Sequence, residues 1–190
     1  MFCSVSAQDS LSSDMENKAA FYSFLDRAKI DYKIPRGYKP AFVPQNAHIG
    51  PILLSSSRHQ LENLNDSVFI YFNIELIDTS QTYVSKMKRF GFAWDMNKNY
   101  LQTHSDTLKF PIERNPKNYT AKNFNADVSG HFEMPIQQNY KDKYSRCRVA
   151  FIHKENQADI LLYFFYNRHN ATTISKHIDK VLDNIKFINK

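Results

Sequence analysis

Alternation of apolar and polar residues predicts three consecutive strands in the second half of the chain. From 124 to 134, apolar residues or glycine take every second position and polar residues take the others, which is typical of a strand with one side in water. Residues 145–153 form a second predicted strand, and residues 159–167 form a third, which is apolar throughout from Ile160 to Tyr166. The short polar turn between the last two predicts an antiparallel hairpin, with the apolar strand central and covered on both faces.

The first half of the chain has one equally clear strand. Residues 68–77 alternate strongly, which predicts a core face and a second face that is at least partly covered. Residues 30–34 also alternate and stop at Pro35, so we expect a short strand that leads into a turn. Residues 39–56 are rich in proline, and we expect mostly loop there, with a short strand at 52–54.

Apolar residues at helical spacing predict helices near both ends of the chain and in the middle. A capping-box sequence opens a predicted helix over residues 14–28. A second helix is predicted over 80–90, and a short one over 57–64. The last predicted helix, over 174–186, separates an apolar side from a charged side, which is typical of a helix docked on a sheet.

Consecutive strands between terminal helices predict an α+β fold. We expect an antiparallel β-sheet covered by the N- and C-terminal amphipathic helices, as an α/β/α or a two-layer α+β sandwich. A chain of 190 residues with 42% hydrophobic residues is long enough to build one core. We therefore expect a single α+β domain over residues 13–190, preceded by a signal-peptide remnant and linker over residues 1–12.

The end of the chain resembles that of PsbP-like proteins, which are named for an extrinsic subunit of photosystem II and share their fold with Ran-binding Mog-type proteins. The resemblance rests on the apolar strand 158–166, the polar turn after it and the helix that closes on Ile185-Lys186-Phe187. The segment from Ile30 to Tyr38, with its Pro-Arg-Gly-Tyr turn, is similar to the opening strand of that family. The resemblance implies an antiparallel sheet between helices and a role in protein binding. It implies no functional residue, because its motifs are architectural.

The charge is basic, with a formal net charge of +6 and a pI of about 9.2. Basic residues are spread along the chain, and the densest group is Lys141, Lys143, Arg146 and Arg148. These four residues are candidates for binding a polyanion such as a nucleic acid or an acidic polysaccharide. A solvated basic surface is the ordinary interpretation, and nucleic acid is the less favoured partner, because no block of like charges appears.

The first residues indicate export. Val5-Ser6-Ala7 resembles the end of a signal peptide, and cleavage would fall before Gln8. The alternative is a frayed cytoplasmic N-terminus. Three Asp-Ser/Thr-apolar triplets, which begin at Asp9, Asp66 and Asp106, resemble sites that some exporting bacteria O-glycosylate. No apolar stretch reaches the length of a transmembrane helix. We expect an exported bacterial protein, periplasmic or extracellular.

Aromatic residues in the predicted loops are candidates for binding a small ligand or a peptide. These ligand-binding candidates are Trp94, Tyr100 and Phe92 in the irregular segment, with Tyr38 and Phe42 in the proline-rich loop. Aromatic side chains in loops mark binding sites more often than those in the core do. The alternative is that they cap the ends of the core.

Polar residues on the alternating strand are weak candidates for a metal site. His131 and Glu133 share its wet face, and a neighbouring strand that carries His153 would complete a site for a hydrolase or another metal-dependent enzyme. The ordinary interpretation is a solvated polar face. Cys147 shares its strand parity with apolar residues, which predicts a buried, inert thiol. No glycine-rich phosphate motif is present, and no pattern indicates a cofactor.

The sequence thus favours an exported binding or interaction domain without catalytic activity, whose partner is a protein or a small ligand. Two alternatives stay open. The first is a hydrolase or metal-dependent enzyme with an unrecognised site, and the second is a domain that binds an anionic polymer.

Overall fold

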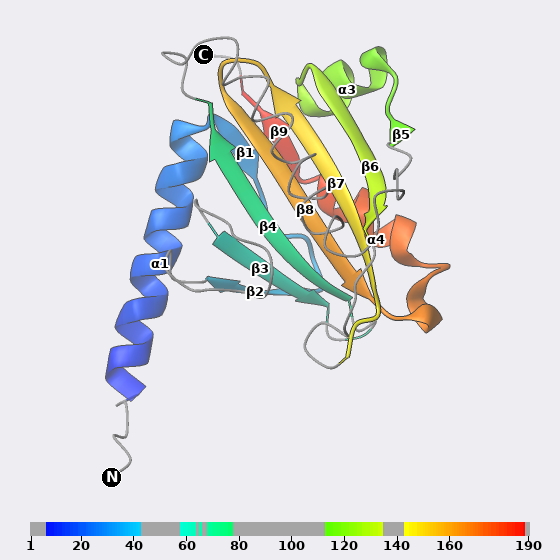
Figure 1. Ribbon diagram of the computed structural model, residues 1–190. Helices are drawn as coiled ribbons and strands as arrows, with labels where there is room; N and C mark the ends of the chain where they lie inside the picture. Colours follow the sequence, from blue (N-terminus) through cyan, green and yellow to red (C-terminus); the bar gives the residue numbers. More distant parts are fainter. Residues whose placement is uncertain are drawn as a thin grey trace, which may run out of the picture.

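The fold is α+β, built around one antiparallel sheet (Figure 1). A computed structural model of the chain describes residues 7–42, 58–63, 65, 68–77, 113–134 and 143–188. Its main sheet has seven strands in the order β2-β3-β4-β8-β7-β6-β5, and every neighbouring pair is antiparallel. The predicted fold class is therefore confirmed.

The strands of the main sheet follow the alternation of the sequence closely. The predicted hairpin at 145–167 is confirmed, because β7 and β8 pair over their full length from Arg146↔Tyr166 to Lys154↔Ala158. Strand β8 is central, with β4 on its other side. The bounds are β2 (Tyr38–Phe42), β3 (Arg58–Asn63), β4 (Val68–Leu76), β5 (Glu113–Arg114), β6 (Val128–Met134), β7 (Arg146–Lys154) and β8 (Ala158–Tyr166).

Both ends of the chain meet in a second, two-stranded sheet. The short strand β1 (Ile30–Tyr32) pairs antiparallel with the last strand, β9 (Ile185–Phe187). Helix α1 (Ala7–Arg27) precedes β1, and helix α4 (Ile174–Leu182) precedes β9. The two terminal helices are thus tied to one another through this strand pair, on the same side of the main sheet (Figure 1).

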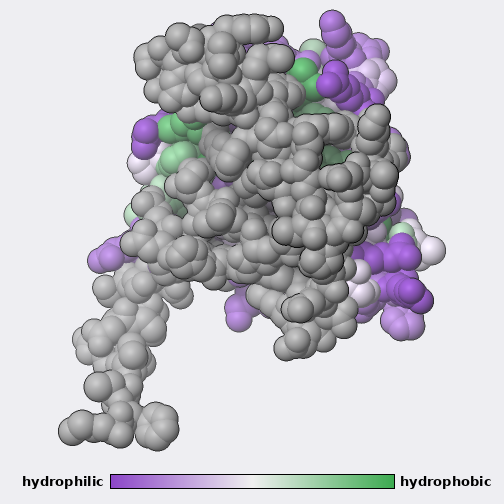
Figure 2. Space-filling model, viewed as in Figure 1, coloured by the Kyte–Doolittle hydropathy of each residue, from purple (hydrophilic) through white to green (hydrophobic). Residues whose placement is uncertain are grey.

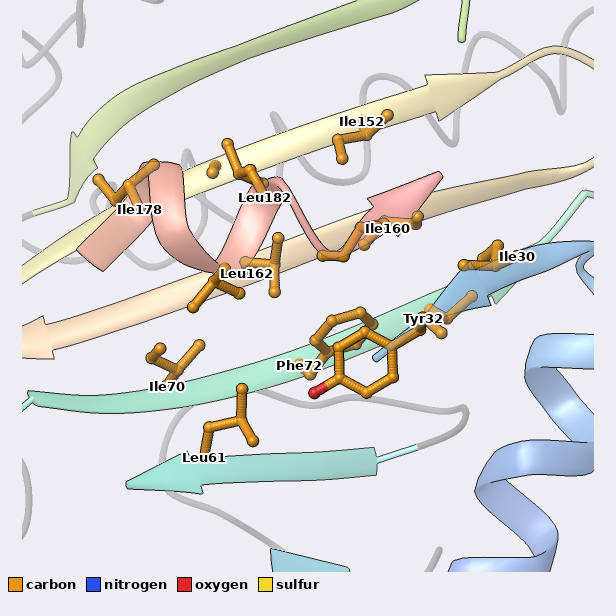
Figure 3. Close-up of a cluster of buried hydrophobic side chains, with 14 of the residues drawn as sticks. Ile30, Tyr32, Leu61, Ile70, Phe72, Ile152, Ile160, Leu162, Ile178 and Leu182 are labelled. Carbon is orange, nitrogen blue, oxygen red and sulfur yellow. The ribbon is translucent and has the colours of Figure 1, made fainter. Parts of the chain in front are cut away.

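One face of the main sheet carries the larger core. Apolar side chains of β3, β4, β7 and β8 pack there against α1, α4 and the β1–β9 pair. Figure 3 shows this layer, with Tyr32 of β1 beside Phe72 of β4, their ring centroids 5.0 Å apart. Helix α4 contributes Ile178, Val181 and Leu182, which are the positions that its periodicity predicts for the core.

The opposite face of the sheet is also buried along its central strands. Phe69 and Tyr71 of β4, with Tyr163 and Phe165 of β8, are each 5% exposed or less. Phe132 of β6 and Val149 of β7 belong to the same cluster. The prediction that the apolar strand is covered on both faces is therefore confirmed.

Several predicted elements differ from the structure. Residues 58–63 form strand β3 and not a helix, so that prediction was wrong. Helix α1 begins at Ala7 and so includes part of the predicted linker. Residues 117–124 form helix α3 (Lys117–Phe124), which ends at Asn125 in a left-handed conformation with φ of 50°. The predicted strand over 124–134 therefore begins only at Val128, because Asn125 turns the chain there.

The other predicted elements of the first half, the helix over 80–90 and the strand at 52–54, lie outside the described residues. Within the described residues, no helix has both the length and the apolar character needed to cross a membrane.

Candidate functional site

A polar cluster lies where β6, β7 and β8 come together beside α4. Glu133 of β6 sits opposite Arg148 of β7 in the sheet register, and its Oε1 accepts a hydrogen bond of 2.5 Å from Arg148 Nε. Arg148 Nη2 also contacts that oxygen, and Arg148 Nη1 lies 3.4 Å from Oγ of Ser175 in the first turn of α4. Tyr166, at the end of β8, donates its hydroxyl to both carboxylate oxygens of Glu133, at 3.1 and 3.0 Å. The carboxylate is therefore held by a guanidinium and a phenol together.

The environment of Tyr166 keeps its phenol protonated. Burial raises the pKa of Tyr166, and the charge and hydrogen bond of Glu133 raise it further, to about 12. Arg148 and Arg146 act in the opposite direction, but their effect is smaller. Tyr166 is thus a hydrogen-bond donor at neutral pH and not a base.

Further basic residues stand on the segments that build this cluster. Arg146 lies opposite Tyr166 in the register, Arg168 follows the end of β8 in the short 3-10 helix η1 (Arg168–Asn170), and Lys176 follows Ser175 in α4. All three side chains are exposed. We call Arg146, Arg148, Arg168 and Lys176 the basic end. Hydrophilic residues gather at the edge of the molecule where η1 and α4 begin (Figure 2).

Few acidic residues balance these charges. The sequence has no Asp or Glu from 143 to 154 or from 160 to 178, which are the segments that supply all four basic residues. Glu133 reaches the cluster from β6 and is paired with Arg148. The start of α4 adds partial positive charge, because a helix N-terminus presents its first N–H groups outward. The basic end therefore carries a local excess of positive charge.

The structure brings together only part of the predicted polyanion group. Arg146 and Arg148 share one face of β7, as their spacing predicts. Lys143 lies apart from them, with its Nζ 5.3 Å from the centre of the Tyr144 ring, which belongs to the cluster on the opposite face. Lys141 lies outside the described residues.

The predicted metal candidates do not come together. His131 Nε2 lies 3.1 Å from Glu113 Oε2, and Glu133 is bound to Arg148. His153 pairs with Val128 in the register, so both side chains lie on the same face of the sheet. Val128 is three residues from His131 on β6, so the side chain of His131 lies on the opposite face. His153 is held instead by Asp159, with Nδ1 2.6 Å from Oδ1. In the part of the chain that the structure describes, no three His, Cys, Asp or Glu side chains lie close enough to hold a metal ion.

The predicted aromatic site is described only in part. Tyr38 was expected in a loop, but it is the first residue of β2 and is buried. Its hydroxyl lies 2.5 Å from Nδ1 of His177 in α4, so it fastens the helix to the sheet edge. Phe42 ends β2, but its side chain lies outside the described part of the structure, as do residues Trp94, Tyr100 and Phe92.

The thiol of Cys147 is fully buried, and burial, together with the charge of Glu133, raises its pKa well above its ordinary value. A thiol of this kind is a poor nucleophile, because the thiolate is the reactive form. The prediction that Cys147 is buried is confirmed.

The sequence matches no family model and no curated protein. The structure is similar to the solution structure of cyanobacterial PsbP (CyanoP) from Synechocystis sp. PCC 6803, with a TM-score of 0.52. The match covers 85% of this chain and 88% of that chain, at 10% sequence identity. The resemblance to PsbP-like proteins that the sequence indicates is thus confirmed for the architecture, and at this identity it concerns the fold alone.

Sequence reasoning missed three members of the site. The apolar strand predicts Tyr166 in the core, where it does lie, but gives no sign that its hydroxyl reaches Glu133. Arg168 and Lys176 stand on segments with no predicted site. The absence of acidic residues from 160 to 178 is the one pattern that points to them, and it becomes informative only when this segment is placed beside Arg146 and Arg148.

Proposed function

We propose that this chain is a non-catalytic binding domain that recognises a negatively charged partner through the basic end. The observation that carries the proposal is the convergence of Arg146, Arg148, Arg168 and Lys176 from three segments, with Glu133 as the acidic residue bound among them. Charge of one sign gathered on a surface steers and orients an oppositely charged partner.

The reactive groups of the described residues support binding rather than catalysis. The thiol of Cys147 is buried, the phenol of Tyr166 is held protonated, and the carboxylate of Glu133 is engaged by Arg148 and Tyr166. The hydrolase hypothesis needs His131, Glu133 and His153 in one site, and these three residues belong to three separate pairs. A role in binding also agrees with the resemblance to PsbP-like proteins.

The test compares binding of anionic probes by the full chain and by a charge-removal variant. The variant Arg146→Ala/Arg168→Ala/Lys176→Ala removes three exposed positive charges and leaves the Arg148–Glu133 pair intact. We expect the full chain to bind a probe such as a heparin fragment, with an affinity that falls as salt is raised and that the triple variant loses. Equal binding by both proteins to every anionic probe contradicts the proposal.

We also propose that the protein is exported, with cleavage before Gln8. Val5-Ser6-Ala7 supports this, and cleavage at that point removes only the first residue of α1. Mass spectrometry of the protein from each fraction of its native cell identifies the first residue of the chain. A mature chain that begins at Gln8 outside the cytoplasm supports export, whereas a cytoplasmic chain that still carries residues 1–7 contradicts it.

A further inference from the structure

We propose that the partner at the basic end is an acidic polypeptide segment, whose carboxylates bind the exposed guanidinium groups of Arg146 and Arg168. The inference rests on the proposed function and names the class of partner. Three of the four basic side chains are arginines, and a planar guanidinium matches a planar carboxylate with two parallel hydrogen bonds.

The site already binds one carboxylate of its own. Glu133 receives hydrogen bonds from Arg148 and Tyr166, and Arg148 also reaches Ser175. Two nitrogens of Arg148, Nε and Nη2, contact the same oxygen of Glu133, Oε1. The side chains of Arg146, Arg168 and Lys176 are exposed, on the strand that carries Arg148, just after the strand that carries Tyr166, and next to Ser175. We expect carboxylates of a partner to bind these exposed basic side chains in the way that Glu133 binds Arg148.

The size of the basic end favours a short segment over a long polymer. Along α4 the excess of positive charge does not continue, because the exposed residues Asp179 and Asp183 flank and offset Lys180. A nucleic acid needs a basic groove that follows its backbone, and a single strand also needs aromatic side chains for stacking. The exposed large apolar residues among the described positions are Met15, Tyr22, Tyr119 and Ile188, and none of them belongs to the basic end.

The positions of the basic and the exposed apolar residues also disfavour a membrane surface as the partner. Proteins that bind a bilayer through basic residues add exposed apolar side chains that enter the interface, or a run of many basic residues. The basic end has four basic residues, and the exposed apolar residues of the described part lie on other elements. A peptide with several Asp or Glu residues thus fits best.

The experiment measures the fluorescence anisotropy of labelled probes with the full chain. The probes are a deca-glutamate peptide, a ten-nucleotide oligothymidylate and vesicles that contain anionic lipid. We expect the full chain to bind the peptide most tightly of the three probes. The triple variant Arg146→Ala/Arg168→Ala/Lys176→Ala should have an affinity for the peptide that is lower by about tenfold or more at low salt. A matched control, Arg114→Ala/Lys117→Ala/Lys122→Ala, removes three exposed charges beside α3 and should change the affinity by less than about twofold.

A fourth protein separates carboxylate recognition from simple attraction. The double variant Arg146→Lys/Arg168→Lys keeps both charges and removes two exposed forked guanidinium groups. We expect it to bind the peptide more weakly and the oligonucleotide with unchanged affinity. If the oligonucleotide or the vesicles bind and the peptide does not, and the triple variant loses that binding, the peptide proposal fails while the proposed function stands. If no anionic probe distinguishes the full chain from the triple variant, both fail.

Discussion

Gly130 of β6 lies directly opposite Phe151 of β7, and the ring of Phe151 fills the space that a side chain at position 130 would need. A Cβ atom built at Gly130 lies 2.7 Å from Cζ of Phe151 and 2.3 Å from the carbonyl oxygen of Glu113. The second contact is with backbone, which has no rotamer to change. The absence of a side chain therefore lets β5 approach β6.

We expect Gly130→Ala to lower the free energy of unfolding by about 1–3 kcal/mol, because the new methyl group overpacks this point. Urea denaturation followed by circular dichroism measures the change. Gly37→Ala is the control for space, since its Cβ would meet only Nζ of Lys180, at 3.7 Å, and its cost comes from a φ of 89°. Adding Phe151→Leu to Gly130→Ala should recover only part of the loss, and a full recovery would show that the Glu113 carbonyl does not matter.

The hydrogen bond between Tyr32 and His59 predicts a second measurable loss. The hydroxyl of Tyr32 lies 2.9 Å from Nε2 of His59, and it joins β1 to β3 inside the core. We expect Tyr32→Phe to destabilise the fold by about 1–3 kcal/mol, because the buried imidazole loses this partner while the ring packing stays. Tyr119→Phe, at a tyrosine that is 41% exposed, should change stability by less than about 0.5 kcal/mol. Equal effects of the two substitutions would contradict a stabilising hydrogen bond between Tyr32 and His59.

Alkaline pH should destabilise the protein through Tyr166. Its pKa is raised from 10.0 to about 12 in the folded state, so between these values the folded chain binds more protons than the unfolded one. Stability from this group is full below pH 10 and is lost as the pH rises toward 12. Burial raises the pKa of Tyr32 as well, which acts in the same direction. The urea midpoint, measured in steps from pH 9 upward, should fall, and it should fall less steeply in Tyr166→Phe than in the wild type.

Removing the charge of Glu133 should lower the pKa of Tyr166. Its carboxylate raises that pKa through its charge and its hydrogen bond, and Gln keeps the shape without the charge. Because burial is the larger cause, we expect the pKa of Tyr166 in Glu133→Gln to stay above its ordinary value. The absorbance of phenolate during alkaline titration, compared with Tyr166→Phe, measures this. An unchanged pKa would show that Glu133 does not act on the phenol.

The thiol of Cys147 should react only when the chain opens. In the variant Cys3→Ser it is the one remaining thiol, and it is fully buried in the folded protein. We expect a disulfide reagent at pH 8 to label it at least about a hundredfold more slowly in buffer than in concentrated urea. Rapid labelling of the native protein would contradict its position in the core.

Elements with a strong apolar period were predictable from the sequence. The hairpin of β7 and β8 follows from a short turn between two strands, and α4 follows from Ile174, Ile178, Val181 and Leu182 on one side. In both cases nearby residues in the sequence decide the structure. The same reasoning gave the antiparallel sheet, because consecutive strands with short connections pair with each other.

Strand β3 was missed because two of its three buried residues are polar. His59, Leu61 and Asn63 alternate inward, but only Leu61 is apolar, so the period of two is hidden. The spacing of Leu61 and Leu64 then resembles a helical turn. Tertiary contacts, including the bond from Tyr32 to His59, make these polar positions part of the core, and no local pattern reveals them.

The relation between His131 and His153 was also beyond the sequence. Both lie at odd positions of strands that pair, but the segment between β6 and β7 is too long to fix their register. A shift of one residue would place both on the same face, and the actual pairing of Val128 with His153 separates them. The basic end could not be predicted for a similar reason, since only the fold brings the segments of Arg168 and Lys176 to that of Arg146.

The pairing of β1 with β9 joins two segments that lie far apart along the chain, Ile30 with Phe187. Such contacts between distant parts of a chain slow folding, because a long loop must close before they form. During synthesis, β1 cannot form this pair until β9 has left the ribosome. Until then, Phe21 and Leu25 of α1 lack part of the layer that covers them, and exposed apolar side chains of this kind make an incomplete chain prone to aggregate.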